Sequence, residues 1–119
     1  MCNLMRMLTL VSLVLWLSAC TTAPKPELPK SVNGGVRFTF LASDAKAVAL
    51  AGSFNGWAKT ATPMTMRDGT GLWSVEVPLK AGEYTFMYLI DGKRWVTPPM
   101  AEDFVTDGFG QINGVVVVR

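Results

Sequence analysis

Hydrophobic and polar side chains alternate along most of the chain from Gly34 onward, and turn residues interrupt the alternation. Residues 36–40 and 73–77 place apolar side chains at every second position. Residues 84–90 form a longer segment in which Tyr84, Phe86, Tyr88 and Ile90 alternate with Thr85, Met87 and Leu89. A period of two is typical of β-strands that are buried on one face. Further short strands are predicted at residues 47–51, 64–66, 94–96 and 112–118.

Glycine-containing turns separate these segments. Asp91-Gly92 is a strong hairpin signal, and residues 68–71 (Asp-Gly-Thr-Gly) form another tight turn because glycine accepts a positive φ. No window of twelve residues carries a helical stripe. Seven short strands between such turns predict an all-β sandwich of two sheets packed face to face. Its expected core consists of Phe38, Phe40, Val48, Leu50, Trp73, Val75, Phe86, Tyr88 and Val116.

The N-terminal segment has the pattern of an export signal. Arg6 precedes an apolar stretch at residues 7–17, which is shorter than the ~20 residues that a membrane-spanning helix needs. The sequence Leu-Ser-Ala-Cys that ends at Cys20 resembles the lipobox of bacterial lipoproteins. The resemblance implies that the Cys20 thiol receives a diacylglyceryl group and that the leader is cut just before it. An ordinary signal peptide, cut after Ala19 or Ala23, is the alternative.

These features divide the chain into three parts. Residues 1–19 are the expected lipoprotein signal peptide, and residues 20–33 are the lipidated cysteine and an extended, proline-containing tether. Residues 34–119 are the expected β-sandwich. The predicted location is the bacterial cell envelope, with the lipid on Cys20 inserted in a membrane. The residue after the cysteine is Thr21 and not an aspartate. The resemblance to Gram-negative lipoproteins therefore implies the outer membrane, if the host is Gram-negative.

Composition narrows the possible chemistry. Eleven basic and nine acidic residues give a net charge of +2 without a basic stripe, which argues against nucleic acid as a partner. The chain has no histidine, and its cysteines are Cys2 and Cys20, so neither a disulfide framework nor a cysteine or histidine metal site is expected. No cofactor is implied. The carboxylates fall mostly at turns or on exposed strand faces and suggest no nucleophile–base pair, so we do not expect an enzyme.

Three motifs in a fixed order carry a family resemblance. They are GSFNGW at residues 52–57, GEYTF at residues 82–86 and IDGKRW at residues 90–95. Together they resemble the glycogen-binding domain of the AMP-activated protein kinase β subunit. They are also similar to the family-48 carbohydrate-binding modules and early-set domains of branching and debranching enzymes. The resemblance extends over residues 36–118 and implies an immunoglobulin-like β-sandwich that binds α-1,4-glucan.

The resemblance also implies which residues bind sugar. Two tryptophans form the sugar platform in that family, and they match Trp57 and Trp95, both beside turn residues. An indole ring packs on the apolar C–H face of a pyranose, while polar groups at the rim bond the hydroxyls. The implied carbohydrate-binding set is Trp57, Trp95, Asn55, Lys93, Phe109 and Asn113.

This chain departs from the family pattern at two positions. The family's lysine falls on Met87, and its glucan-contacting asparagine falls on Gly114, with Asn113 adjacent. Phe109 falls near the position of an aliphatic residue that contacts the glucan in the family. Lys93 lies beside Trp95 and can replace the hydrogen-bond donors that are lost at the two positions. The alternative to sugar binding is a protein-interaction or structural module of the envelope with a separate protein as its partner. In that case the two tryptophans only cap the sandwich.

Overall fold

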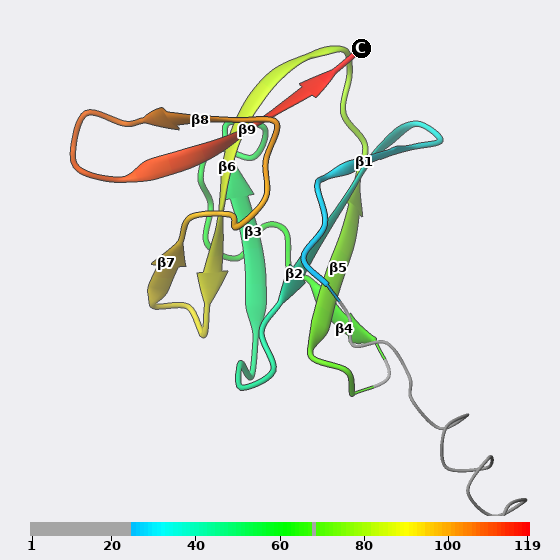
Figure 1. Ribbon diagram of the computed structural model, residues 1–119, viewed down its shortest axis with the longest axis vertical. Helices are drawn as coiled ribbons and strands as arrows, with labels where there is room; N and C mark the ends of the chain where they lie inside the picture. Colours follow the sequence, from blue (N-terminus) through cyan, green and yellow to red (C-terminus); the bar gives the residue numbers. More distant parts are fainter. Residues whose placement is uncertain (1–24, 68) are drawn as a thin grey trace, which may run out of the picture.

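The computed structural model describes residues 25–67 and 69–119, so the expectations for the leader and for Cys20 lie outside the described residues. Two antiparallel sheets form the domain (Figure 1). One has the strand order β1-β2-β5-β4, and the other has the order β3-β6-β9-β8, with β7 paired to β6. Residues 25–67 and 69–119 contain no candidate for a membrane-spanning helix. The strands are β1 (Lys30–Val32), β2 (Gly35–Leu41), β3 (Val48–Gly52), β4 (Thr65–Arg67), β5 (Leu72–Val77), β6 (Gly82–Ile90), β7 (Arg94–Val96), β8 (Asp103–Thr106) and β9 (Ile112–Val118).

The all-β prediction is confirmed, and the two sheets form an immunoglobulin-like sandwich. The predicted bounds of β7 and β9 match those of the structure, and the other five predicted strands differ by one or two residues at their ends. Two strands were not predicted. β8 is exposed at all four positions and therefore shows no burial period. β1 lies inside residues 20–33, which we assigned to the tether, and pairs with β2, so the folded part begins at Lys30 rather than at Gly34.

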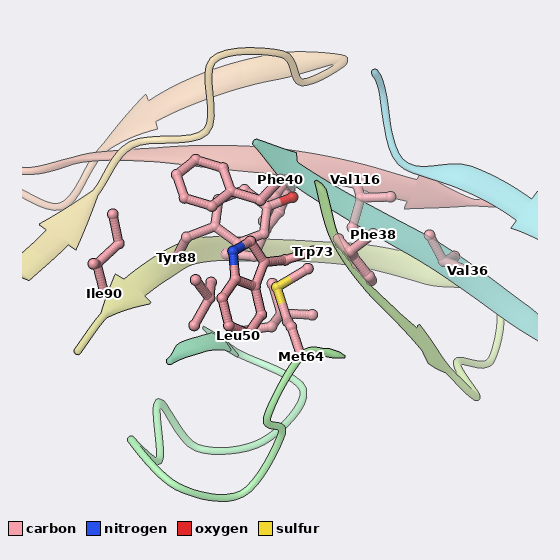
Figure 2. Packing of buried hydrophobic residues seen from close by; sticks show 11 residues of the cluster. Val36, Phe38, Phe40, Leu50, Met64, Trp73, Tyr88, Ile90 and Val116 are labelled. Carbon is pink, nitrogen blue, oxygen red and sulfur yellow. The ribbon is translucent and has the colours of Figure 1, made fainter. Parts of the chain in front are cut away.

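The core fills the space between the two sheets (Figure 2). Every predicted core residue belongs to it, except that Val75 is only partly buried and packs against the cluster. Phe40 stacks on Tyr88 with ring centroids 4.4 Å apart, and Phe38 meets Phe86 edge to face at 5.0 Å. These contacts join β2 in one sheet to β6 in the other. Val36, Met64 and Ile90 complete the buried cluster.

The polar atoms of the buried aromatic side chains are satisfied by backbone carbonyls. The Trp73 indole N–H donates to the Ala42 carbonyl at 2.9 Å, and the Tyr88 hydroxyl donates to the Thr39 carbonyl at 3.2 Å. Burial raises the pKa of Tyr88 well above its ordinary range. Each pairing avoids the cost of an unsatisfied buried donor, which is about 1–3 kcal/mol. Trp73 is therefore a core residue, as its place within an alternating strand predicted.

Strand β6 is buried on both faces along its second half. The alternation of residues 84–90 predicted one buried face, but Met87 and Leu89 on the opposite face are 4% and 1% exposed. Leu89 lies opposite Ala49 of β3 and opposite Trp95 of β7, so neighbouring strands flank it on both sides. The low exposure of Met87 and Leu89 shows that the outer face of this sheet is covered here, and this is where the candidate site lies.

Candidate functional site

The site lies at the point along β6 where its pairing partner changes from β9 to β7. Residues Gly82–Phe86 of β6 pair with β9, whereas Tyr88–Ile90 pair with β7, and Met87 lies between the two stretches. In Figure 1, β7 and the β8–β9 hairpin lie on the same side of the molecule. Because Phe86 and Tyr88 point into the core, Met87 points to the outer face. A groove of about 420 Å³ lies on this face, lined by Trp57, Thr85, Met87, Trp95, Asp107, Gln111 and Asn113.

Trp57 reaches the groove from a tight turn after β3. Its amide donates to the Gly52 carbonyl at 3.0 Å, and the Ala58 amide donates to the Asn55 carbonyl at 3.4 Å. The turn holds Trp57 at a φ of 59°, in the left-handed region. A bulky residue rarely adopts this conformation, which costs of order 1–3 kcal/mol and persists only where the surrounding structure imposes it. The turn therefore fixes the indole ring at the expense of backbone strain.

Trp95 approaches the groove from β7. It lies opposite Leu89 of β6 and is half-buried, as is Trp57. The centroids of the two indole rings are 6.5 Å apart, and the ring planes meet at 64°. The rings are thus neighbours in one groove, but they do not share a plane. Together with the Met87 side chain they form its apolar side.

The polar side of the groove comes from β9 and from the turn that precedes it. The Asp107 Oδ1 atom accepts hydrogen bonds from the amides of Phe109 at 2.7 Å and Gln111 at 3.1 Å, and the Asp107 amide donates to the Gln111 carbonyl. Asn113 is only 8% exposed. Within the described part of the chain its side-chain amide has no protein partner. This amide is thus available to a ligand in the groove.

The structure brings three of the six predicted carbohydrate-binding residues into the groove, namely Trp57, Trp95 and Asn113. Lys93 lies in the β6–β7 turn, where its amide donates to Ile90, and it does not line the groove. Phe109 is 92% exposed in the β8–β9 turn and also lies outside the lining.

Asn55, the remaining predicted residue, supports the site from within the Trp57 turn. Its Oδ1 accepts from the Gly52 amide, and its Nδ2 donates to the Leu50 carbonyl and to the Thr62 hydroxyl, each at 3.0 Å. Both ends of the side-chain amide are thus hydrogen-bonded within the protein and not to a ligand in the groove. Asn55 holds the turn that carries Trp57.

Thr85, Asp107 and Gln111 line the groove but were not predicted from the sequence. Strand alternation could have placed Thr85 beside Met87 on one face. Gly114, where the family asparagine falls, faces Pro98, Ala101 and Phe86 instead of the groove. Its neighbour Asn113 is the asparagine that the groove contains.

This arrangement suits a neutral, hydroxyl-rich ligand with apolar faces. Indole rings pack against the C–H face of a sugar ring, and Asn113, Gln111 and Thr85 can exchange hydrogen bonds with hydroxyl groups. The described residues contain no group of three or more acidic, histidine or cysteine side chains that could hold a metal ion. A β-sandwich with an aromatic groove on the outer face of one sheet is typical of carbohydrate-binding modules.

Comparison with known families identifies the module. Residues 24–101 match the family described as carbohydrate-binding module 48 (isoamylase N-terminal domain), and the chain belongs to this family.

Several bacterial enzymes contain a similar segment. The 1,4-α-glucan branching enzyme GlgB of Pseudomonas syringae pv. tomato is 44% identical over 78 residues, which cover 60% of this chain and 10% of the enzyme. The corresponding enzyme of Pseudomonas putida is 36% identical over 77 residues (62% and 10%), and GlgB 2 of Rhizobium johnstonii is 33% identical over 75 residues (60% and 10%). The chain thus spans about a tenth of the length of these relatives.

Proposed function

We propose that this chain is a membrane-anchored, non-catalytic module that binds α-1,4-glucan. The paired Trp57 and Trp95 rings in the groove carry the proposal. Successive glucose units of an α-1,4 chain turn relative to one another, so the chain curves. Two ring planes that meet at 64° can each face a different sugar of a curved chain. A flat β-1,4 chain is better matched by coplanar rings.

The family and its relatives support the same ligand class. The chain belongs to a carbohydrate-binding family, and the relatives are named as enzymes that act on 1,4-α-glucan. Met87 in place of the family's lysine leaves hydrogen bonding to the neutral side chains of Thr85, Gln111 and Asn113 and to Asp107. Phe109 at the exposed tip and Lys93 beside Trp95 would add contacts to a chain longer than the groove.

Affinity electrophoresis in gels that contain amylose or glycogen tests the proposal. We expect Trp57→Ala and Trp95→Ala each to weaken retention at least about tenfold, which corresponds to about 1.4 kcal/mol. Phe104→Ala is the matched control, because Phe104 is a half-exposed aromatic residue that does not line the groove. Cello-oligosaccharides should not compete. Absence of retention of the unaltered protein by any α-glucan at millimolar sugar would reject the function.

The groove provides no support for catalysis. Asp107 is the single carboxylate among the described residues that line it. Hydrolysis of a glycosidic bond ordinarily uses two carboxylates at a fixed separation across the substrate. We expect no release of reducing sugar from amylose or glycogen, measured over a day at micromolar protein.

We further propose that Cys20 carries the lipid anchor and that the module works in the bacterial cell envelope, at the outer membrane if the host is Gram-negative. Support comes from the lipobox-like sequence after the apolar stretch. The chain enters the domain through β1, in the sheet opposite the one that bears the groove, so an anchor there leaves the groove accessible. Cys20→Ser should move the protein from the membrane fraction to the soluble fraction and abolish palmitate labelling. Unchanged fractionation and labelling would refute the anchor.

Binding to a separate envelope protein is the second candidate function. The β8–β9 hairpin favours it, because Phe104, Val105 and Ile112 are each about half exposed on a projecting element (Figure 1). If this function holds, Phe104→Lys should abolish stoichiometric co-purification of one envelope protein, whereas Trp57→Ala should preserve it. The glucan proposal predicts that Trp57→Ala weakens retention on amylose and that Phe104→Lys preserves it.

A further inference from the structure

The groove contains a single charged side chain among its described lining residues, and that side chain is Asp107. We propose that Asp107 is a specificity-determining residue that makes the groove select neutral glucan over glucan that carries anionic groups such as phosphate esters. This inference rests on the proposed glucan binding and extends it. Asp107 was not among the expected binding residues.

One oxygen of the Asp107 carboxylate has a structural task. Oδ1 accepts from the Phe109 and Gln111 amides and so closes the β8–β9 turn. Within the described residues Oδ2 accepts no hydrogen bond. It is therefore available to a sugar hydroxyl, and an ionised acceptor makes a stronger hydrogen bond than a neutral one. The backbone amides hold the carboxylate in place before a ligand arrives.

No cation in the described lining of the groove offsets this charge. The other lining residues are all neutral: Trp57, Thr85, Met87, Trp95, Gln111 and Asn113. The ion pairs of the described residues, Arg37–Glu76 and Arg119–Glu102, do not involve Asp107. A phosphate or carboxylate on a bound sugar would lie near this uncompensated negative charge. Like charges in a partly solvated groove are expected to weaken binding by about five- to tenfold per ligand charge at low salt.

The test compares maltodextrin with maltodextrin of the same length phosphorylated on its 6-hydroxyls, by calorimetric titration. At low salt we expect the unaltered protein to bind the neutral chain at least about tenfold more tightly. Asp107→Asn keeps an oxygen that accepts from the Phe109 and Gln111 amides but removes the charge, and should reduce this preference to about threefold or less. The preference should also decrease in 0.3 M salt, because the Debye length shortens to below ~8 Å.

Asp103→Asn is the control for net charge. Asp103 is exposed on β8, its Oδ1 accepts from the following Phe104 amide, and it does not line the groove. Asp103→Asn should retain the full preference for the neutral chain. Gln111→Lys is a second test that leaves the turn intact, since Gln111 joins the turn through its backbone. Its added cation should lower the preference as Asp107→Asn does.

Equal affinity of the unaltered protein for the two ligands would overturn the inference and leave glucan binding standing. The same holds if Asp107→Asn and Asp103→Asn behave alike. If the unaltered protein binds neither ligand, the proposed function fails and the inference fails with it.

Discussion

The left-handed backbone at Trp57 allows a direct test of how the turn after β3 is held. We compare Trp57→Gly with Trp57→Ala. Both variants lose the indole ring and its edge-to-face contact with Trp95, which is worth about 0.5–1.5 kcal/mol beyond buried area. They differ in the cost of a φ of 59°, which glycine adopts freely and which costs an L-residue roughly 1–2 kcal/mol.

The greater chain entropy of glycine in the unfolded state offsets part of that difference. We therefore expect Trp57→Gly to be the more stable variant by about 1 kcal/mol, which is about 4–8 °C in Tm for a domain of this size. Urea denaturation followed by circular dichroism measures the free energy of unfolding of each variant. Equal stability, or a more stable alanine variant, would show that the turn does not hold position 57 in the left-handed region.

The same pair of substitutions at Trp95 serves as the control. Trp95 lies in β7 and has no positive φ. Glycine in a strand is less stable than alanine by roughly 0.5–1 kcal/mol. The order of the two variants should therefore reverse: Trp95→Ala should be more stable than Trp95→Gly. An identical order at both positions would indicate a general effect of glycine and not strain at Trp57.

Two further predictions follow from single contacts. The Asp91 Oδ1 atom accepts hydrogen bonds from the Ala47 and Lys46 amides, and these bonds lower the pKa of the Asp91 carboxyl group. The ionised carboxylate therefore stabilises the fold fully above its unfolded pKa of about 3.9, and this stabilisation is lost as the pH falls through the lower pKa of the folded state. Asp91→Asn should reduce the loss of stability between pH 5 and pH 2, measured by thermal denaturation, and an unchanged acid profile would contradict this. A Cβ atom at Gly114 would lie 2.7 Å from the Pro98 Cγ atom and 3.1 Å from both Ala101 and Phe86. Gly114→Ala should therefore cost about 1–3 kcal/mol of unfolding free energy, and a variant of full stability would show that β9 can shift here without cost.

The sequence predicted most strands because burial on one face leaves a period of two. Arg94–Val96 and Ile112–Val118 were predicted with the bounds that the structure has. Asp103–Thr106 could not be found in this way, because all four residues are exposed and carry no periodic signal. The second buried face of β6 was also missed, since the Trp57 turn that lies beside Met87 in the groove is remote from β6 in sequence.

The sequence predicted those residues of the candidate site that can be recognised from their own type and position. Trp57 and Trp95 are large aromatic residues beside turns, and the structure places both in one groove. Asp107 and Gln111 have no such signature, because their place depends on β8 pairing with β9 beside β7. The choice between Asn113 and Gly114 depends on strand register: Gly114 lies opposite Phe86, so it shares the core-facing side, and Asn113 takes the outer side.

Residues from the Trp57 turn, β6, β7 and the β8–β9 hairpin meet in the groove, so any variant that loosens the fold also threatens binding. The Trp57 variants separate the two effects. Trp57→Gly and Trp57→Ala both lack the ring that would face the sugar, yet they are expected to differ in stability by about 1 kcal/mol. If the ring binds the glucan directly, both variants lose affinity to the same extent, measured well below either melting temperature. If affinity follows stability instead, the indole acts only by holding the turn in place, and sugar contact at Trp57 is disproved.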